Sequence, residues 1–275
     1  MTVSTTRSGT ERIARAFARA REERRLAIVV YLTVGYPERA ATAPLLRAAL
    51  DGGADLIELG VPFSDPLADG ATVQRASEVA LRNGVTLADC IGEAETIVRE
   101  RDVPVLLMGY ANPFLRYRGG LGDFAGDAAR AGVAGIIVPD LPAEESAEFD
   151  AALGPEGLAR IDLYAPTTPD ARLARLVPSA HGFVYCVSLT GVTGARRALA
   201  SDVGDLVARV RRHTDLPIAV GFGISAPEHV AALRGVADAV VVGSAALDTI
   251  AVAPPRQRAD ALREFVSGLA AAGRA

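Results

Sequence analysis

Short apolar runs rich in β-branched residues recur along the whole chain and alternate with segments of helical period. The runs that predict strands are 27–34, 55–59, 105–108, 135–138, 161–164, 183–187, 218–220 and 239–242. The helical segments between them are 39–50, 87–101, 123–131, 143–153, 171–176, 203–212 and 227–233, with a last helix over 259–271. Alternating strands and helices favour parallel pairing with right-handed crossovers, and eight such units close a barrel. The pattern therefore predicts an α/β fold, a single (β/α)8 TIM barrel.

The 275 residues suit one such domain, because barrels of about 250 residues are common. We predict a flexible N-terminus over residues 1–10, which are rich in Ser, Thr and Gly, and a single barrel domain over 11–275. The charged amphipathic stretch that opens this domain predicts an extra N-terminal helix.

An open, doubly wound sheet is the competing architecture, since periodicity alone does not prove closure. Gly221, Gly223 and Ala226 form a GxGxxA string that resembles a dinucleotide-binding fingerprint. This string follows the seventh predicted strand, and one further strand is too little for a nucleotide-binding half. The dinucleotide interpretation is therefore rejected.

Charge and composition exclude several classes of partner. The net charge is -4 and the pI is about 5.5, so no overall basic field is present to hold nucleic acid. The sequence has neither a signal-peptide core nor an 18-residue apolar run, so no membrane span is expected. Cys90 and Cys186 lie far apart without metal-ligand spacing and suit reduced thiols. We expect a cytoplasmic protein.

The chain contains no lysine, and all 29 of its basic residues are arginine. A mechanism that needs a lysine Schiff base is therefore excluded. The three histidines, His181, His213 and His229, are scattered before a strand, near a helix end and within a helix. Surface or helix-capping roles account for them better than a metal site, and no metal is expected.

The second predicted strand carries the most informative acidic residues. Glu58 lies one residue inside the end of the strand, and Asp69 ends the turn-rich loop that follows. A carboxylate among apolar strand residues is either paired structurally or functional, because burying an unpaired charge is costly. Asp69, before Gly70, could alone be a helix cap. Together, Glu58 and Asp69 suggest an acid/base pair at the strand ends, where barrels place their chemistry.

Glycine-bearing loops follow the last three strands, in the quadrant where barrels commonly bind phosphate. Glycine also permits tight turns, which explains any one of these loops more easily than all three. The candidate anion-binding residues are Thr193 and Gly194 after strand six, Gly221 and Gly223 after strand seven, and Gly243 and Ser244 after strand eight.

Four of the few aromatic residues lie in or just after predicted strands. They are Tyr31, Tyr110, Tyr185 and Phe222. They would suit either a flat apolar ligand pocket or the filling of the core.

At these positions the chain resembles the tryptophan synthase alpha subunit family, in matching order and spacing from YLTVGYP at Tyr31 onward. The most specific motif is ELGVPFSDPLADG at residues 58–70, because the glycine motifs occur in many phosphate-binding barrels. The other motifs are GYANP at 109–113, VPDLPAEES at 138–146, GVTGAR at 191–196, GFGIS at 221–225 and VVGSA at 241–245.

The resemblance implies cleavage of indole-3-glycerol phosphate to indole and D-glyceraldehyde 3-phosphate in L-tryptophan biosynthesis. It implies that Glu58 is the main acid/base catalyst and that Asp69 interacts with the indole nitrogen. It places Tyr185 beside both the catalytic carboxylate and the indole. Tyr31, Tyr110 and Phe222 would line the indole pocket, and Gly194, Gly223, Gly243 and Ser244 would contact the glycerol phosphate. Thr193 would lie in a closing loop.

The same resemblance implies a partner, a tryptophan synthase beta subunit in an alpha2beta2 assembly, facing the loop around Asp65. Pyridoxal phosphate would be bound only by that partner, and this chain would carry no cofactor. The alternatives are a standalone indole-glycerol phosphate lyase and a non-catalytic regulatory barrel subunit, the second of which Glu58 and Asp69 argue against. A sugar-phosphate epimerase would need metal-binding histidines at strand ends, and an indole-glycerol phosphate synthase would need catalytic lysines.

Overall fold

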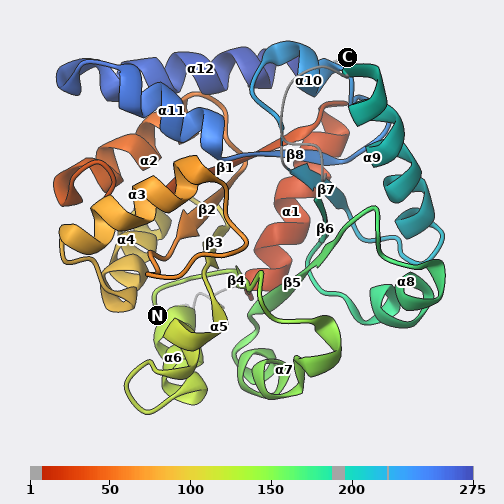
Figure 1. Cartoon of the computed structure of the whole chain (residues 1–275), viewed down its shortest axis with the longest axis horizontal. Coiled ribbons are helices and arrows are strands. Elements are labelled where there is room, and N and C mark those ends of the chain that lie inside the picture. The colour runs from red at the N-terminus through yellow and green to blue at the C-terminus, as the bar shows by residue number, and fades with distance from the viewer. Residues whose placement is uncertain (1–7, 188–195, 222, 275) are drawn as a thin grey trace, which may run out of the picture.

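A computed structural model describes residues 8–187, 196–221 and 223–274. Eight parallel strands form a closed barrel in the order β1 to β8, with β8 pairing back onto β1 (Figure 1). The strands are β1 (Ala27–Thr33), β2 (Leu56–Gly60), β3 (Val105–Met108), β4 (Gly135–Ile137), β5 (Ala159–Tyr164), β6 (Val184–Val187), β7 (Ile218–Gly221) and β8 (Ala239–Val242). The predicted (β/α)8 barrel is confirmed, with each strand boundary within two residues of the prediction.

Helices surround the barrel on its outer face (Figure 1). They are α2 (Thr42–Asp51), α3 (Ala71–Arg82), α4 (Leu87–Glu100), α5 (Ala111–Leu115), α6 (Leu121–Arg130), α7 (Ala147–Leu153), α8 (Asp170–Leu176), α9 (Arg196–Arg211), α10 (Pro227–Ala231), α11 (Ser244–Val252) and α12 (Arg258–Ala272). The prediction did not delimit α3, α5 or α11, and it began α9 at residue 203 instead of Arg196. None of the described helices is long and apolar enough to cross a membrane.

Strand alternation divides the apolar side chains into two clusters. The larger one packs between the strands and the outer helices. The smaller one fills the barrel interior with residues such as Val29, Leu56, Leu106, Ile161 and Phe183. The barrel is thus a packed core, and only the ends of its strands are available for a site.

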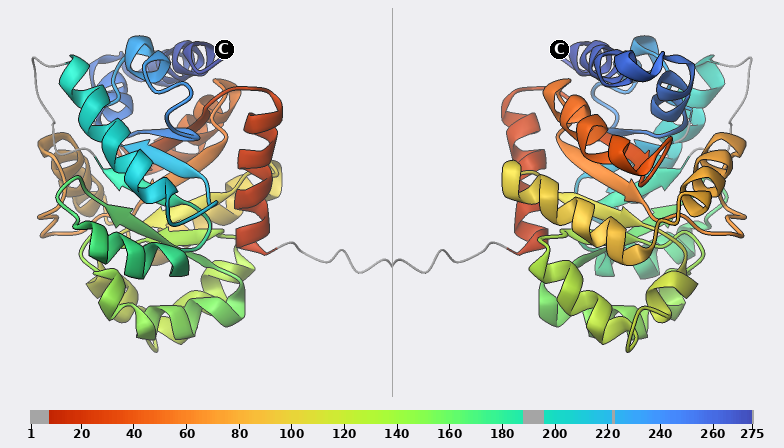
Figure 2. Two further views of the ribbon diagram at one scale, coloured as in Figure 1. Left: turned by 90° about the vertical axis from the view of Figure 1, so that its right-hand side faces the viewer. Right: turned by 90° about the vertical axis from the view of Figure 1, so that its left-hand side faces the viewer.

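The N-terminal end of the barrel is closed by α1 (Gly9–Glu22), the predicted extra helix (Figure 2). The helix begins two residues before the predicted domain boundary, because Ser8 and Glu11 form a reciprocal capping box. Its apolar face joins the interior cluster, where the ring centroids of Phe17 and Phe183 lie 5.4 Å apart.

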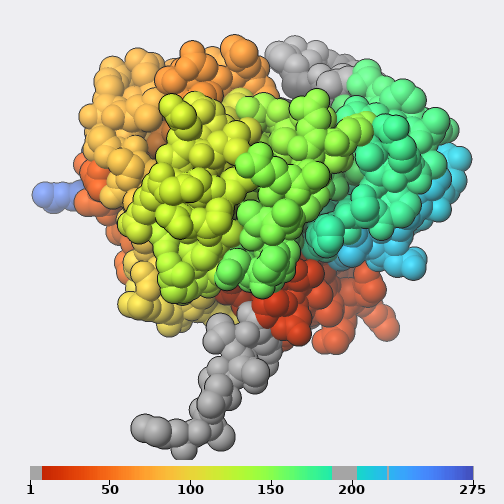
Figure 3. All heavy atoms as spheres, turned by 90° about the horizontal axis from the view of Figure 1, so that it is seen from below, coloured from red at the N-terminus to blue at the C-terminus, as the bar shows by residue number. Residues whose placement is uncertain are grey.

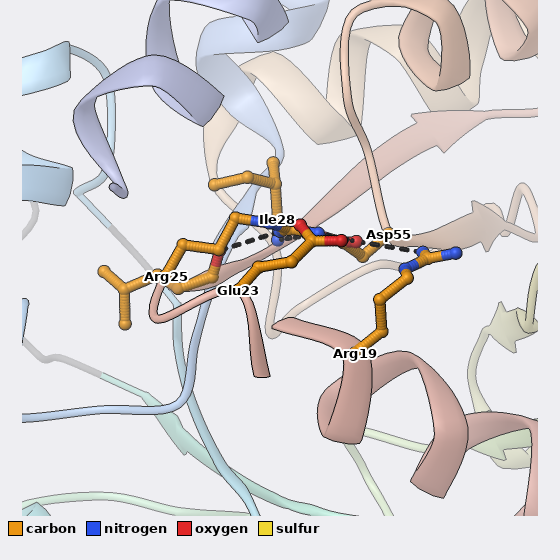
Figure 4. A network of polar contacts seen from close by, with 6 residues as sticks. Arg19, Glu23, Arg25, Ile28 and Asp55 are labelled. Carbon is orange, nitrogen blue, oxygen red and sulfur yellow. Dashed lines mark hydrogen bonds and ion pairs between the residues drawn. The ribbon is translucent and has the colours of Figure 1, made fainter. Parts of the chain in front are cut away.

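A buried ionic cluster lies at this same end, around Asp55 just before β2 (Figure 4). Arg25 donates to both carboxylate oxygens of Asp55, at 2.6 and 2.7 Å, and Arg19 donates at 3.1 Å. Asp55 also accepts the backbone N–H of Ile28 at 3.0 Å, and Glu23 binds Arg25 from the other side at 2.6 Å. Asp55 is 2% exposed, so the cluster fixes β1 to β2 and α1 with a fully partnered carboxylate.

Candidate functional site

The side chain of Glu58 points toward the mouth of the barrel from the middle of β2, on the same face as the interior residue Leu56. It is 1% exposed, and Oε2 has no hydrogen-bond partner among the described residues. Burial, reinforced by the negative charge of Asp69, raises the pKa of Glu58 to about 8. Glu58 is therefore a protonated acid at neutral pH.

Asp69 ends the loop that follows β2 and is only partly buried. Burial raises the pKa of Asp69 to about 6, and a hydrogen bond from the Tyr110 hydroxyl opposes the rise. The Tyr110 oxygen also accepts the N–H of Ala68 at 2.8 Å, which ties the loop to the end of β3. The ring of Phe63 stacks on Tyr110 with centroids 5.1 Å apart. Asp69 thus stays largely ionised at neutral pH, close to a protonated Glu58.

Phe63 was not among the predicted site residues, although it lies inside the motif that carries Glu58 and Asp69. An aromatic residue in a loop rich in Pro and Asp was the available signal. Its contact with Tyr110 could not be read from the sequence, because the two residues come from different strand ends.

Tyr31 and Tyr185 enter the same mouth from β1 and β6, and both are almost fully buried. The Tyr31 hydroxyl lies 3.2 Å from the hydroxyl of Thr33, a contact that the sequence did not predict. Burial raises the pKa of both tyrosines, and the negative charges of Glu58 and Asp69 add to the rise. Both phenols therefore remain neutral hydroxyl groups beside the acidic pair.

Each of these tyrosines leans across the neighbouring strand onto a glycine. A Cβ atom at Gly60 would collide with the hydroxyl of Tyr31, and one at Gly221 would collide with the hydroxyl of Tyr185. Glycine at the ends of β2 and β7 thus makes room for a phenol. The sequence assigned Gly221 to a phosphate-binding loop, and the structure gives it this packing role.

The candidate anion-binding residues that the structure describes lie after β7 and β8. Gly223 has a φ of +82°, in the region that favours glycine, and is exposed. Gly243 caps the N-terminus of α11 without a side-chain bond, and Ser244 is the first residue of that helix. The predicted site residues Thr193, Gly194 and Phe222 lie outside the described residues.

The loop between β2 and α3 presents apolar surface beside the mouth. Leu67 is 92% exposed and is the most exposed large apolar side chain of the described residues. Asp65, two residues earlier, is also exposed. Among the described residues, no three His, Cys, Asp or Glu side chains are grouped so that they could hold a metal ion.

The fold and these side chains define an enzymatic (β/α)8 barrel with two acidic groups of raised pKa where its strands end. The sequence profile of the tryptophan synthase alpha chain matches residues 17–273. The chain therefore belongs to the tryptophan synthase alpha chain family, and it is a lyase subunit of tryptophan biosynthesis.

Individual relatives agree with this assignment. The tryptophan synthase alpha chain of Roseiflexus castenholzii is 53% identical over 257 residues, covering 93% of this chain and 97% of the relative. That of Chloroflexus aggregans is 50% identical, covering 95% and 97%. A solved structure of tryptophan synthase from M. tuberculosis, in an aminoacrylate-bound form, superposes with a TM-score of 0.86 at 36% identity, covering 96% and 99%.

Proposed function

We propose that this chain cleaves indole-3-glycerol phosphate to indole and D-glyceraldehyde 3-phosphate, with Glu58 and Asp69 as its catalytic residues. The observation that carries the proposal is the difference between the two acids. Glu58 is buried without a cation among the described residues and has a pKa of about 8, whereas Asp69 has a pKa of about 6. Neighbouring carboxyl groups whose pKa values are pushed apart suit separate acid and anion roles.

The reaction begins with a proton from Glu58 to C3 of the indole ring, because Glu58 is the protonated acid at neutral pH. The ring then carries a positive charge at N1, which the Asp69 carboxylate stabilises. The ionised Glu58 next removes the proton of the C3′ hydroxyl. The bond between C3 and C3′ breaks, its electrons return to the indole ring, and C3′ becomes the aldehyde carbon. Glu58 ends protonated, so the cycle consumes no other reagent.

The aromatic side chains at the mouth support binding of a flat indole ring. Tyr31, Tyr110, Tyr185 and, in the undescribed part, Phe222 are proposed to line that pocket. Gly223, Gly243 and Ser244 are proposed to bind the phosphate with Thr193 and Gly194. The backbone N–H groups at the start of α11 are suited to an anion.

A beta-subunit partner in an alpha2beta2 assembly is part of the proposal. The loop around Asp65, which the resemblance assigns to that partner, supports it, because Asp65 is exposed and Leu67 on the same loop is 92% exposed. Pyridoxal phosphate is assigned to the partner and no cofactor to this chain, which has no lysine to form a Schiff base.

A cytoplasmic location is supported by the unpaired, buried Cys90 and Cys186.

The test is release of indole from indole-3-glycerol phosphate by the purified chain, with and without a beta subunit. We expect activity that rises with the partner. Glu58→Gln should lower kcat by roughly 10²- to 10⁴-fold, because proton transfer is lost while the shape of the side chain is kept. Absence of activity in the unchanged chain under both conditions would favour a non-catalytic regulatory subunit. Activity of the unchanged chain that a beta subunit does not raise would favour the standalone lyase.

A further inference from the structure

A cavity of about 240 Å³ lies at β5, beside the 138–143 loop and the start of α8, and none of the described acid/base or aromatic site residues lines it. It is smaller than the pockets of about 300–1,000 Å³ that usually hold drug-sized ligands, so only a small molecule would fit. Figure 3 shows the face on which α6, α7 and α8 lie side by side. The cavity is lined by Val138, Pro139, Asp140, Leu141, Pro142, Ala143, Arg160, Ile161, Asp162, Leu163, Tyr164 and Arg172.

Two buried polar side chains of β5, Asp162 and Tyr164, line this cavity, and each has one oxygen without a hydrogen-bond partner in the described residues. Asp162 is 4% exposed and Tyr164 is 3% exposed. Asp162 Oδ2 and the Tyr164 hydroxyl have no hydrogen-bond partner within the described residues. Both side chains point outward from the barrel, since Ile161 between Arg160 and Asp162 belongs to the interior cluster. Unpaired buried polar atoms are costly, so a complementary group in the cavity would stabilise them.

The remaining charges of the cavity are held in place by neighbouring elements. Arg160 binds Asp162 Oδ1 and also both oxygens of Asp150, at 2.6 and 3.2 Å. Arg172 donates through Nε and Nη2 to Glu144, each at 2.9 Å. No bond to Arg172 Nη1 is found in the described parts of the chain, which leaves its N–H groups available. The cavity therefore offers a carboxylate oxygen, a phenol and a guanidinium N–H together.

We propose that this cavity binds a small zwitterion that carries both an ammonium and a carboxylate group, of the size of a free α-amino acid. The ammonium group is bound by Asp162 Oδ2, and the carboxylate group is bound by Arg172 Nη1 and the Tyr164 hydroxyl. A simple anion would satisfy only the donors, and a simple amine would satisfy only the carboxylate. Charge-assisted hydrogen bonds at both ends thus select the zwitterion.

The test measures binding of glycine, L-alanine and L-threonine to the full chain by calorimetry and ligand-observed NMR, with acetate and methylamine as half-ligands. We expect saturable binding of at least one amino acid and much weaker binding of either half-ligand. Tyr164→Phe removes only a hydroxyl and should weaken binding by roughly three- to tenfold. Asp162→Asn should weaken it by more than about tenfold. Tyr117→Phe is the matched control, because that hydroxyl binds Asp127 elsewhere, at 2.8 Å.

Glu58→Gln should leave this binding unchanged, which separates the cavity from the proposed active site at the barrel mouth. Three results would overturn the proposal: no saturable binding of any amino acid, acetate binding as tightly as the zwitterions, or equal binding by the unchanged chain and the Tyr164→Phe and Asp162→Asn variants. The first of these would show that the cavity holds ordered water only.

Discussion

Asp55, just before β2, and Glu58, in the middle of that strand, are both buried acidic residues, but only Asp55 has cationic partners among the described residues. Asp55, just before the strand, is 2% exposed, and Glu58, within it, is 1% exposed. Asp55 accepts hydrogen bonds from Arg25, Arg19 and the backbone of Ile28. Glu58 Oε2 has no hydrogen-bond partner in the described residues, and the negative charge of Asp69 adds to the effect of burial in raising the pKa of Glu58. Similar burial therefore accompanies an ion pair with Arg25 at Asp55 and a retained proton at Glu58.

This difference separates, along one strand, a carboxylate that stabilises the fold from the acid that we propose as the catalyst. At the N-terminal end of β2, the Asp55 carboxylate forms ion pairs with Arg19 and Arg25, so it stabilises the packing of α1, β1 and β2. No cation is found beside Glu58 in the described part of the chain, so burial lets this carboxyl group keep its proton. The presence of a partner, more than the depth of burial, distinguishes the two roles.

The largest expected effect is on stability at the N-terminal end. Asp55→Asn removes the buried anion of Arg25 and leaves it only the more exposed Glu23, so it should lower the free energy of unfolding by about 3–5 kcal/mol. Urea denaturation measures this, with Glu23→Gln as a control that changes an exposed partner of Arg25. The kcat of the folded Asp55→Asn protein should be unchanged. A drop in kcat with intact stability would reverse the assignment of the two ends.

A smaller effect is expected at Gly60, at the C-terminal end of the strand. Gly60→Ala places a methyl group where the Tyr31 hydroxyl lies and should lower the free energy of unfolding by about 1–3 kcal/mol. It should also lower kcat/KM, because Tyr31 is displaced beside Glu58. Gly92→Ala, in α4 with open space around it, is the matched control and should be neutral or stabilising. Equal free energies of unfolding and equal kcat/KM for the two variants would mean that the position of Tyr31 does not depend on glycine at residue 60.

The third expected effect is a pH dependence of stability, which comes from Glu58 above about pH 6. Its pKa is raised from 4.5 in the unfolded chain to about 8 in the fold, so the folded state holds a proton that the unfolded state releases. The free energy of unfolding should therefore fall as pH rises through this window, by up to about 1.4 kcal/mol per pH unit. Asp69 contributes in the same direction only up to about pH 6. In Glu58→Gln, the free energy of unfolding from urea denaturation should change less between pH 6 and 8 than in the unchanged chain. An equal change in both proteins would contradict the proposed protonation of Glu58.

The barrel itself could be predicted from the sequence, because the alternation of buried strands and amphipathic helices is a local pattern. Val105–Met108 and Ala239–Val242 were predicted to the residue. The start of α9 was placed late, and α3 was not delimited, since polar residues such as Gln74 and Ser77 weaken the apolar period there.

The acidic pair was predicted because its members share one strand and its loop. The contacts that set their chemistry were not, because they join residues distant in sequence. Tyr110 reaches Asp69 from β3, and Phe63 stacks on Tyr110. The glycines at residues 60 and 221 give room to the phenols of the preceding strands, which only the closed barrel reveals.

The packing of α1 against the interior cluster closes the barrel at its N-terminal end and leaves the C-terminal end open. Because Ile13 and Phe17 fill the floor, anything that enters or leaves does so between the loops that follow the strands. Leu67 stands at the rim of that opening. A protein bound over these loops would therefore control both the entry of substrate and the release of product.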